Sequence, residues 1–213
     1  NIKLAGSHAG VSIGEDGPSQ MALEDLAILR AVPGCAVVYP CDAVSTERLV
    51  AEIAQRPGMA YMRTSRPKTP VRYAADEPFP IGGSKVLTQS ANDVAAVIAA
   101  GVTVGEAMKA YEQLKGDGIS IRVIDAYSVQ PIDATTMIEA GRATDGVLIT
   151  VEDHYSTGGL GDAVSEAVAG AGFAVHRLAV REVRGSGQPD ELLDRYGISA
   201  RHIVDAVRAA RRG

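Results

Sequence analysis

The 213-residue chain has only two cysteines, no apolar run long enough to span a membrane, and no internal block of basic residues. Cys35 and Cys41 are too few for a disulfide framework or a cysteine-based metal cluster, so we expect two reduced thiols in a cytoplasmic protein. A membrane-spanning helix needs ~20 consecutive apolar residues, so no membrane partner is expected. A net charge of −5 and a pI of about 5.4 argue against a nucleic-acid partner.

Sequence signatures of nucleotide and metal sites are also missing. A glycine-rich stretch at 158–161 follows the triplet Glu-Asp-His at 152–154, but it has neither the G-x-G-x-x-G order nor the lysine of a P-loop. We interpret this stretch as the turn from a strand into a helix, with a structural or interface role. His176 and His202 have no partner at ligand spacing and are interpreted as structural, so no metal ligand is expected in this chain.

The apolar residues that are present follow a repeated strand–helix order. At the front of the chain, short buried-type strands alternate with amphipathic helices expected at 21–32 and 43–55. This order predicts a parallel sheet with crossover helices. After a stretch rich in proline and glycine at 67–83, the same alternation returns, with one strand expected at 119–126.

The chain is therefore predicted to be an α/β protein in two pieces joined by a linker. Residues 1–66 are too few for a complete doubly wound domain, whereas residues 84–213 have the size of an ordinary domain. Because the chain begins with Asn1 directly in strand-like sequence, we expect a fragment, a processed product or half of a divided enzyme.

The densest group of glycine and polar residues is the loop at 6–20, between the first strand and the first helix. Glycines accept positive φ angles and let a backbone approach a ligand closely. The ends of parallel strands are also where α/β sheets present ligand-binding groups. An ordinary connecting loop is the competing interpretation of these residues taken alone.

The order of residues in this loop resembles that of transketolases, the thiamine diphosphate enzymes that move two-carbon ketol units between sugar phosphates. The resemblance is carried by Gly-Glu-Asp-Gly-Pro-Ser-Gln at 14–20, Gly-Ser-His at 6–8 and Met-Ala-Leu-Glu-Asp-Leu-Ala at 21–27. It runs to the end of the chain, which corresponds to the last third of a family member. It implies the end of a pyrimidine-binding domain at 1–66, a linker at 67–83 and a three-layer α/β C-terminal domain at 84–213.

The resemblance also assigns roles to four residues. It implies that His8 holds the phosphate of the sugar substrate, that Asp16 accepts a hydrogen bond from a sugar hydroxyl, and that Arg66 is a second phosphate clamp. Gln20 is implied to contact the cofactor or the first donor carbons; many transketolases have His there, and an amide cannot shuttle protons near pH 7. Without the resemblance, these four residues read as structural, turn-capping or surface residues.

Essential parts of the enzyme are expected outside this chain. In the family, the catalytic glutamate lies upstream, and a diphosphate-binding module with a Gly-Asp-Gly run and a downstream Asn holds the metal, Mg²⁺ or Ca²⁺. No Gly-Asp-Gly run followed by an Asn is present here. We therefore expect no catalytic residue in this chain, which needs an N-terminal transketolase section, or its own missing N-terminal part, and a homodimer to act on sugar phosphates.

Two kinds of alternative remain. Deoxyxylulose-phosphate synthase and the β subunit of a 2-oxo-acid dehydrogenase share the architecture, although Gly-Glu-Asp-Gly-Pro is closer to transketolases. The chain can instead be a non-catalytic assembly or dimerisation module, or a proteolytic remnant. A front piece standing alone is expected to expose an apolar sheet edge and to self-associate.

Overall fold

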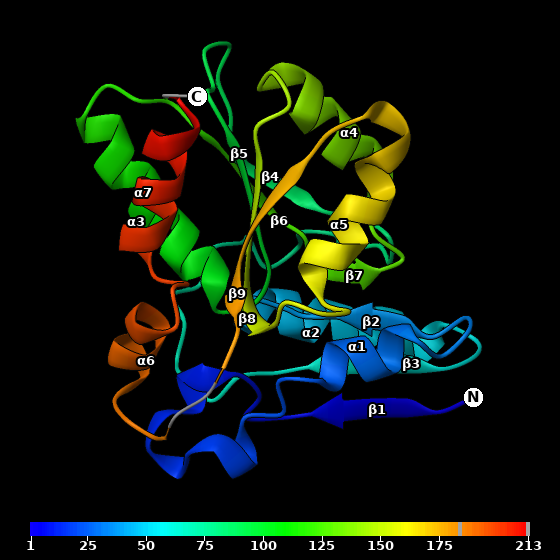
Figure 1. Ribbon diagram of the computed structural model, residues 1–213. Coiled ribbons are helices and arrows are strands. Elements are labelled where there is room, and N and C mark those ends of the chain that lie inside the picture. The colour runs from blue at the N-terminus through cyan, green and yellow to red at the C-terminus, as the bar shows by residue number, and fades with distance from the viewer. Residues whose placement is uncertain (183–184, 212–213) are drawn as a thin grey trace.

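A computed structural model describes residues 1–182 and 185–211 and contains two sheets flanked by helices (Figure 1). The first sheet has the order β1 (Lys3–Gly6), β3 (Ala60–Arg63), β2 (Ala36–Val38) and β7 (Ser128–Gln130). The second has the order β4 (Lys85–Thr88), β6 (Arg122–Asp125), β5 (Ala96–Ala99), β8 (Leu148–Tyr155) and β9 (Val175–Val180). The helices are α1 (Asp25–Arg30), α2 (Ala43–Gln55), α3 (Thr103–Gly116), α4 (Ala134–Ala143), α5 (Leu160–Val168), α6 (Pro189–Arg195) and α7 (Ala200–Ala210). Short 3-10 segments are η1 (Val11–Asp16), η2 (Pro18–Gln20) and η3 (Ala169–Ala171).

In the first sheet, β1, β2 and β3 run parallel, and the helices α1 and α2 pack on opposite faces. Successive residues of a strand point to opposite faces of its sheet. Accordingly Val37 of β2 shares a core cluster with Leu26 of α1, whereas Val38 shares one with Leu49 and Ile53 of α2. This confirms the parallel α/β arrangement predicted for the front of the chain.

The second sheet is the middle of a three-layer α/β fold, with α3 and α7 on one face and α4 and α5 on the other (Figure 1). Val97 of β5 belongs to the same core cluster as Val104 of α3, and its neighbour Ile98 to that of Met137 of α4 and Val164 of α5. Strands β5, β6, β8 and β9 are parallel, and only the edge strand β4 is antiparallel to its neighbour in this sheet. The predicted three-layer architecture is confirmed.

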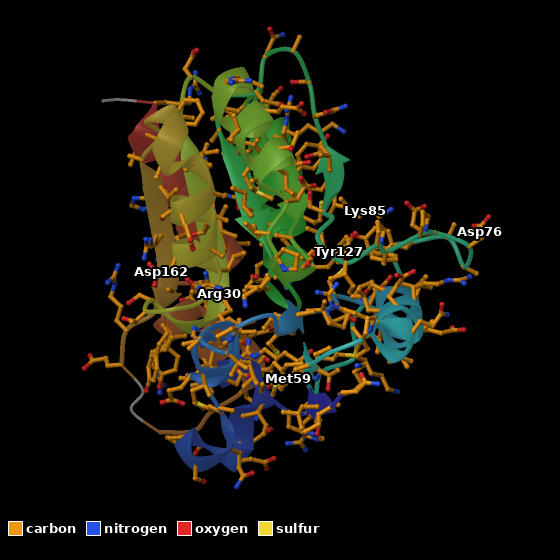
Figure 2. The ribbon with its side chains drawn as sticks, turned by 90° about the vertical axis from the view of Figure 1, so that its right-hand side faces the viewer. Arg30, Met59, Asp76, Lys85, Tyr127 and Asp162 are labelled. Carbon is orange, nitrogen blue, oxygen red and sulfur yellow. The ribbon has the colours of Figure 1, made fainter. Side chains whose placement is uncertain are left out.

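The two sheets share a continuous apolar core. One cluster joins Leu26 of α1 to Ile98 of β5 and Leu160 of α5. Strand β7 lies between β6 and α4 in the sequence but pairs antiparallel with β2, so the back of the chain supplies a strand to the first sheet. Figure 2 shows Arg30 of α1 and Asp162 of α5 close together at this junction, where the charge of Arg30 acts on Asp162.

The residues between the sheets, 67–83, are packed rather than loosely extended. Phe79 is buried, and its ring makes edge-to-face contacts with Tyr73 and Tyr127, at centroid distances of 4.8 and 4.9 Å. The Tyr73 hydroxyl donates a hydrogen bond of 2.7 Å to Asp125 at the end of β6. Figure 2 shows Tyr127 and Lys85 beside this segment, and the Lys85 ammonium lies 5.0 Å from the Phe79 ring centroid. The stretch therefore ties the two sheets together.

Two predicted elements differ from the structure. The helix expected at 21–32 is reduced to Asp25–Arg30, because Ala22 adopts a φ of +46° that no α-helix allows and Met21 and Leu23 are buried in the core beneath the second sheet. The strand expected at 119–126 is shorter and is followed by a second strand, β7. In both cases tertiary packing overrides the local apolar pattern.

Candidate functional site

The candidate site is built on two loops at the C-terminal ends of β1 and β3. We call residues 6–20 the glycine loop and residues 63–66 the arginine loop. β1 and β3 are parallel neighbours, with Gly6 opposite Arg63. The Thr64 amide donates to the Gly6 carbonyl at 2.7 Å, and the Ala9 amide donates to the Thr64 carbonyl at 3.1 Å. These hydrogen bonds join the two loops directly beyond the sheet.

The structure brings together two of the four predicted site residues, Asp16 and Arg66. The Arg66 Nη1 lies 3.0 Å from the Asp16 Oδ2, and it also lies 3.4 Å from the Ile13 carbonyl oxygen. Both side chains of the pair remain about half exposed, at 46% and 47%. A pair so open to water contributes only ~0–1 kcal/mol to stability, so an incoming ligand can replace it at little cost.

His8 and Gln20 are exposed on the glycine loop but do not join this pair. His8 adopts a φ of +65°, and its Nδ1 lies 2.9 Å from the Ser7 hydroxyl oxygen. Gln20 ends η2, where its backbone amide donates to the Gly17 carbonyl; its side chain makes no hydrogen bond to any other residue that the structure describes. Both side chains are thus free to meet a ligand from solvent.

Two glycines let the glycine loop pack closely against β8 and the start of α6. Gly10 has a φ of +93°, and a Cβ there would lie 2.0 Å from the Asp153 Oδ2. Gly14 has a φ of +79°, and a Cβ there would lie 3.0 Å from the Pro189 Cδ. A larger residue at either position would meet both backbone strain and a steric overlap.

Asp153 of β8 contacts the glycine loop, although the sequence indicated only a structural or interface role for its stretch. Its carboxylate is fully buried and accepts hydrogen bonds from the Val11 amide at 2.7 Å and from the Ser12 amide at 3.5 Å. Burial raises the pKa of Asp153, and the positive charge of Arg63 opposes that rise. The position of an aspartate at the end of a strand was the one sequence signal for this contact.

Arg63 is a buried structural residue rather than a ligand-binding one. Its side chain has no exposed surface, its Nε donates to the Asp25 Oδ2 at 3.0 Å, and its Cζ lies 4.7 Å from the centroid of the Tyr39 ring. The Tyr61 hydroxyl donates to the same Asp25 oxygen at 2.6 Å. Burial and the Asp25 carboxylate raise the pKa of Tyr61, which keeps this hydroxyl protonated as a donor. The network fixes the base of the arginine loop.

The exposed side chains on the two loops suit an anionic, hydroxyl-rich ligand better than a metal ion. They offer a guanidinium, an imidazole, an amide, serine hydroxyls and the two carboxylates of Glu15 and Asp16, which are groups that bind phosphates and sugar hydroxyls. Within residues 1–182 and 185–211, no group of three histidine, cysteine, aspartate or glutamate side chains can hold a metal ion. No helix in the same ranges is long and apolar enough to cross a membrane.

Comparison with known proteins decides the family. Residues 1–72 match the model of the transketolase pyrimidine-binding domain, and residues 84–203 match the model of the transketolase C-terminal domain. The chain belongs to the transketolase family. It is 56% identical over 209 residues to transketolase-like protein 2 of Mus musculus, covering 98% of this chain and 33% of that protein. It is 51% identical to transketolase of Homo sapiens, covering 98% and 34%. The chain thus spans about a third of the length of these relatives.

Solved transketolase structures share the fold. A chain described as split gene transketolase, inactive beta4 tetramer, matches with a TM-score of 0.87 and 35% identity over 99% of this chain and 66% of that one. Transketolase of Campylobacter jejuni matches with a TM-score of 0.75 and 19% identity, covering 97% and 31%, which supports the fold alone.

Proposed function

We propose that this chain is the C-terminal section of a transketolase that transfers a two-carbon ketol unit from a ketose phosphate to an aldose phosphate. The observation that carries the proposal is the pairing of Asp16 with Arg66 on two joined loops that also carry His8, in a chain of the transketolase family. Residues 1–66 are then the end of the pyrimidine-binding domain, 67–83 a linker and 84–213 the C-terminal domain. The setting proposed for this enzyme is the cytoplasm.

In this proposal the exposed polar residues divide the substrate between them. Arg66 binds the phosphate, because a planar guanidinium offers two parallel donors that match phosphate oxygens. His8 donates a further hydrogen bond to the phosphate from the neighbouring loop. Asp16 accepts a hydrogen bond from a sugar hydroxyl, and the adjacent Arg66 compensates its charge.

The covalent chemistry is proposed to come from thiamine diphosphate, bound with Mg²⁺ or Ca²⁺. This cofactor supplies the electron sink that lets a carbon–carbon bond of the ketose break and re-form. The exposed Gln20 fits a contact with the cofactor or with the donor carbons beside it. The described residues of this chain hold no metal-binding group, so an N-terminal section and a homodimer would have to supply the rest of the site. The isolated chain is accordingly expected to be inactive.

The test is a titration followed by reconstitution. Thiamine diphosphate with magnesium is titrated into this chain by calorimetry, first alone and then after adding the N-terminal part of a transketolase that contains the diphosphate-binding module. Ketol transfer from a ketose phosphate to an aldose phosphate is measured for the same two samples. We expect saturable binding and transfer only in the mixture, with both lost if either chain is omitted.

The outcome separates this function from its alternatives. A mixture that binds no cofactor and transfers no ketol unit would contradict the proposal and leave an assembly module or a remnant. A mixture that binds thiamine diphosphate but processes only a 2-oxo acid, with or without glyceraldehyde 3-phosphate, would indicate one of the related thiamine diphosphate enzymes instead.

A further inference from the structure

We propose that Asp153, in the C-terminal half of the chain, is a positioning residue that fixes the glycine loop and through it Asp16. The inference rests on the proposed function. It gives the three-layer part of the molecule a role in substrate binding, although all four predicted site residues lie in the first 66 residues.

The contact is made where the glycine loop begins its 3-10 segment. The Asp153 Oδ1 accepts from the Val11 amide at 2.7 Å, and the Oδ2 lies 3.5 Å from the Ser12 amide. These are the first two residues of η1, whose last residue is Asp16. Gly14 interrupts η1 with a non-helical backbone, so the segment cannot hold its own shape as a regular helix would. An external acceptor at its start therefore determines where the segment lies.

The glycine loop is shaped to admit this carboxylate. A Cβ at Gly10 would lie 2.0 Å from the Asp153 Oδ2, so only a residue without a side chain leaves room for the contact. The Gly10 amide in turn donates to the Met21 carbonyl at 2.6 Å, which closes the loop on itself. Loop and carboxylate thus fit each other at one point.

Arg63 of the arginine loop supplies a positive charge that compensates the negative charge of Asp153. Asp153 and Arg63 are both fully buried, and the positive charge of Arg63 favours the ionised form of Asp153. The Arg63 Nη1 and Nη2 atoms make no hydrogen bond among the residues that the structure describes, so their charge remains available to the surrounding carboxylates. Because Arg63 opens the segment that ends in Arg66, one buried carboxylate influences both loops of the site.

The far end of η1 is also held by the C-terminal half. The Gln188 Nε2 donates to the Glu15 Oε1 at 3.1 Å, next to Asp16. The backbone at Gly14 passes so close to Pro189 that an added Cβ would lie 3.0 Å from its Cδ. With Asp153 at one end and this contact at the other, the loop is clamped between β8 and the start of α6. The Asp153 contact is the buried one, and its removal is expected to release the loop.

The first measurement is amide hydrogen exchange of this chain alone, in the wild type and in the Asp153→Ala and Asp153→Asn variants. For Asp153→Ala we expect exchange in peptides covering residues 10–17 to be about tenfold faster or more, because charge-accepted hydrogen bonds are lost. Peptides covering β5 and α3 should exchange at the wild-type rate. Asp125→Asn is the matched control: Asp125 is an equally buried aspartate at the end of β6, but it accepts from Tyr73 rather than from the glycine loop.

The second measurement is made in the reconstituted enzyme. We expect Asp153→Ala to raise the KM for a phosphorylated ketose about tenfold with less than about threefold loss in kcat, since a displaced Asp16 weakens binding first. Asp153→Asn retains an oxygen acceptor for the Val11 amide and should recover part of the loss. Asp125→Asn should leave the KM unchanged.

The two measurements keep the inference separate from the proposed function. Unchanged exchange at 10–17, or faster exchange everywhere, would overturn the positioning role whatever the enzyme does. Faster loop exchange with an unchanged KM would also overturn it. If Asp153→Ala does not fold, Asp153→Asn decides: a smaller increase in exchange at 10–17 with a smaller rise in KM supports the positioning role, and wild-type values of both overturn it. If the mixture transfers no ketol unit, the proposed function fails, and the exchange data still decide whether Asp153 fixes the loop.

Discussion

At the scale of single residues, the Asp16–Arg66 pair contributes little to the stability of the fold, but its groups can bind a ligand strongly. The two side chains come from different loops and are about half exposed. Water screens such a pair, whereas a phosphate bound by the same guanidinium forms charge-assisted hydrogen bonds. Substitution of Arg66 should therefore affect binding far more than stability.

We predict that Arg66→Ala raises the KM for phosphorylated sugars about 10- to 100-fold in the reconstituted enzyme, the loss expected for a charge-assisted contact of ~1.5–3 kcal/mol. The free energy of unfolding of the chain should fall by less than ~1 kcal/mol. Steady-state kinetics and urea unfolding measure the two effects. Arg48→Ala is the control, since Arg48 of α2 donates a hydrogen bond to the Ala75 carbonyl and touches neither loop of the site. An unchanged KM would remove the phosphate role of Arg66.

Gly10 allows a second prediction at this scale. Gly10→Ala combines a φ of +93° with a Cβ that would lie only 2.0 Å from the Asp153 Oδ2, so we expect a loss of at least ~3 kcal/mol of unfolding free energy. Gly58→Ala has nearly the same φ, +91°, but no described atom within 4 Å of its Cβ, and should cost only ~1–2 kcal/mol. Urea unfolding of both variants gives the comparison. Equal losses would show that backbone strain alone, and not the Asp153 contact, requires glycine at position 10.

The resemblance to transketolases predicted four site residues. All four are exposed in the structure, and two of them form a pair. The pairing of Asp16 with Arg66 depends on β1 and β3 being neighbours in the sheet, which no local pattern states. The Asp153 contact depends on two distant segments meeting, so only the position of an aspartate at a strand end could be read from the sequence. Contacts across 50 or 142 residues are decided by topology rather than by spacing.

At the scale of elements, the end of β8 connects three parts of the molecule. Glu152 accepts from the Leu160 and Gly161 amides at the start of α5. Asp153 accepts from the glycine loop, and His154 Nε2 lies 3.4 Å from the Ala27 amide of α1. The sequence predicted a structural or interface role for this stretch, and the contacts described are structural ones within the chain. The shortened first helix was not predictable, because the positive φ of Ala22 follows from the burial of its neighbours.

The triplet also predicts how stability depends on pH. Burial raises the pKa of Glu152 to about 7. Its protonation therefore contributes to the free energy of unfolding fully below pH 4.5, and this contribution is lost as the pH rises through 7. Burial lowers the pKa of His154 to about 4. Its contribution to the free energy of unfolding is therefore present above pH 6.5 and is lost as the pH falls towards 4. The two residues therefore oppose each other between pH 4.5 and 7.

Glu152→Gln should remove one side of this balance. As the pH falls from 7 to 5, the free energy of unfolding of the variant should decrease relative to that of the wild type by on the order of 2 kcal/mol. Urea unfolding at pH 7, 6 and 5 measures the difference. Glu139→Gln, which removes an exposed carboxyl of α4, is the control and should follow the wild-type profile. Parallel profiles for Glu152→Gln and wild type would contradict the assignment.

At the scale of the whole molecule, the sequence predicted the fold class but not how the two pieces join. Hydrophobic periodicity located strands and helices because each buries one stripe or face. It could not show that β7 crosses into the first sheet, or that Leu26 and Ile98 share one core. The consequence is that the two pieces are expected to unfold together, since neither retains a complete core when the other opens.

The free edge of the first sheet leads to a prediction about the whole molecule in solution. Among the described residues, β1 pairs only with β3; Leu4 of β1 is 41% exposed, and Ile2, just before the strand, is 58% exposed. Unpaired backbone groups beside exposed apolar side chains are a template for pairing with another chain. We therefore expect the chain to self-associate as its concentration rises, and the Leu4→Lys variant to remain smaller because a charge on the edge opposes pairing.

Sedimentation velocity over a concentration series measures this, with Val71→Lys as the control. Val71 is even more exposed, at 64%, but it lies in the segment between the two sheets rather than on the edge. Val71→Lys should associate like the wild type, and adding the N-terminal part of a transketolase should suppress self-association by covering β1. A chain that stays monomeric throughout, or equal behaviour of the two lysine variants, would show that this edge is not an association surface.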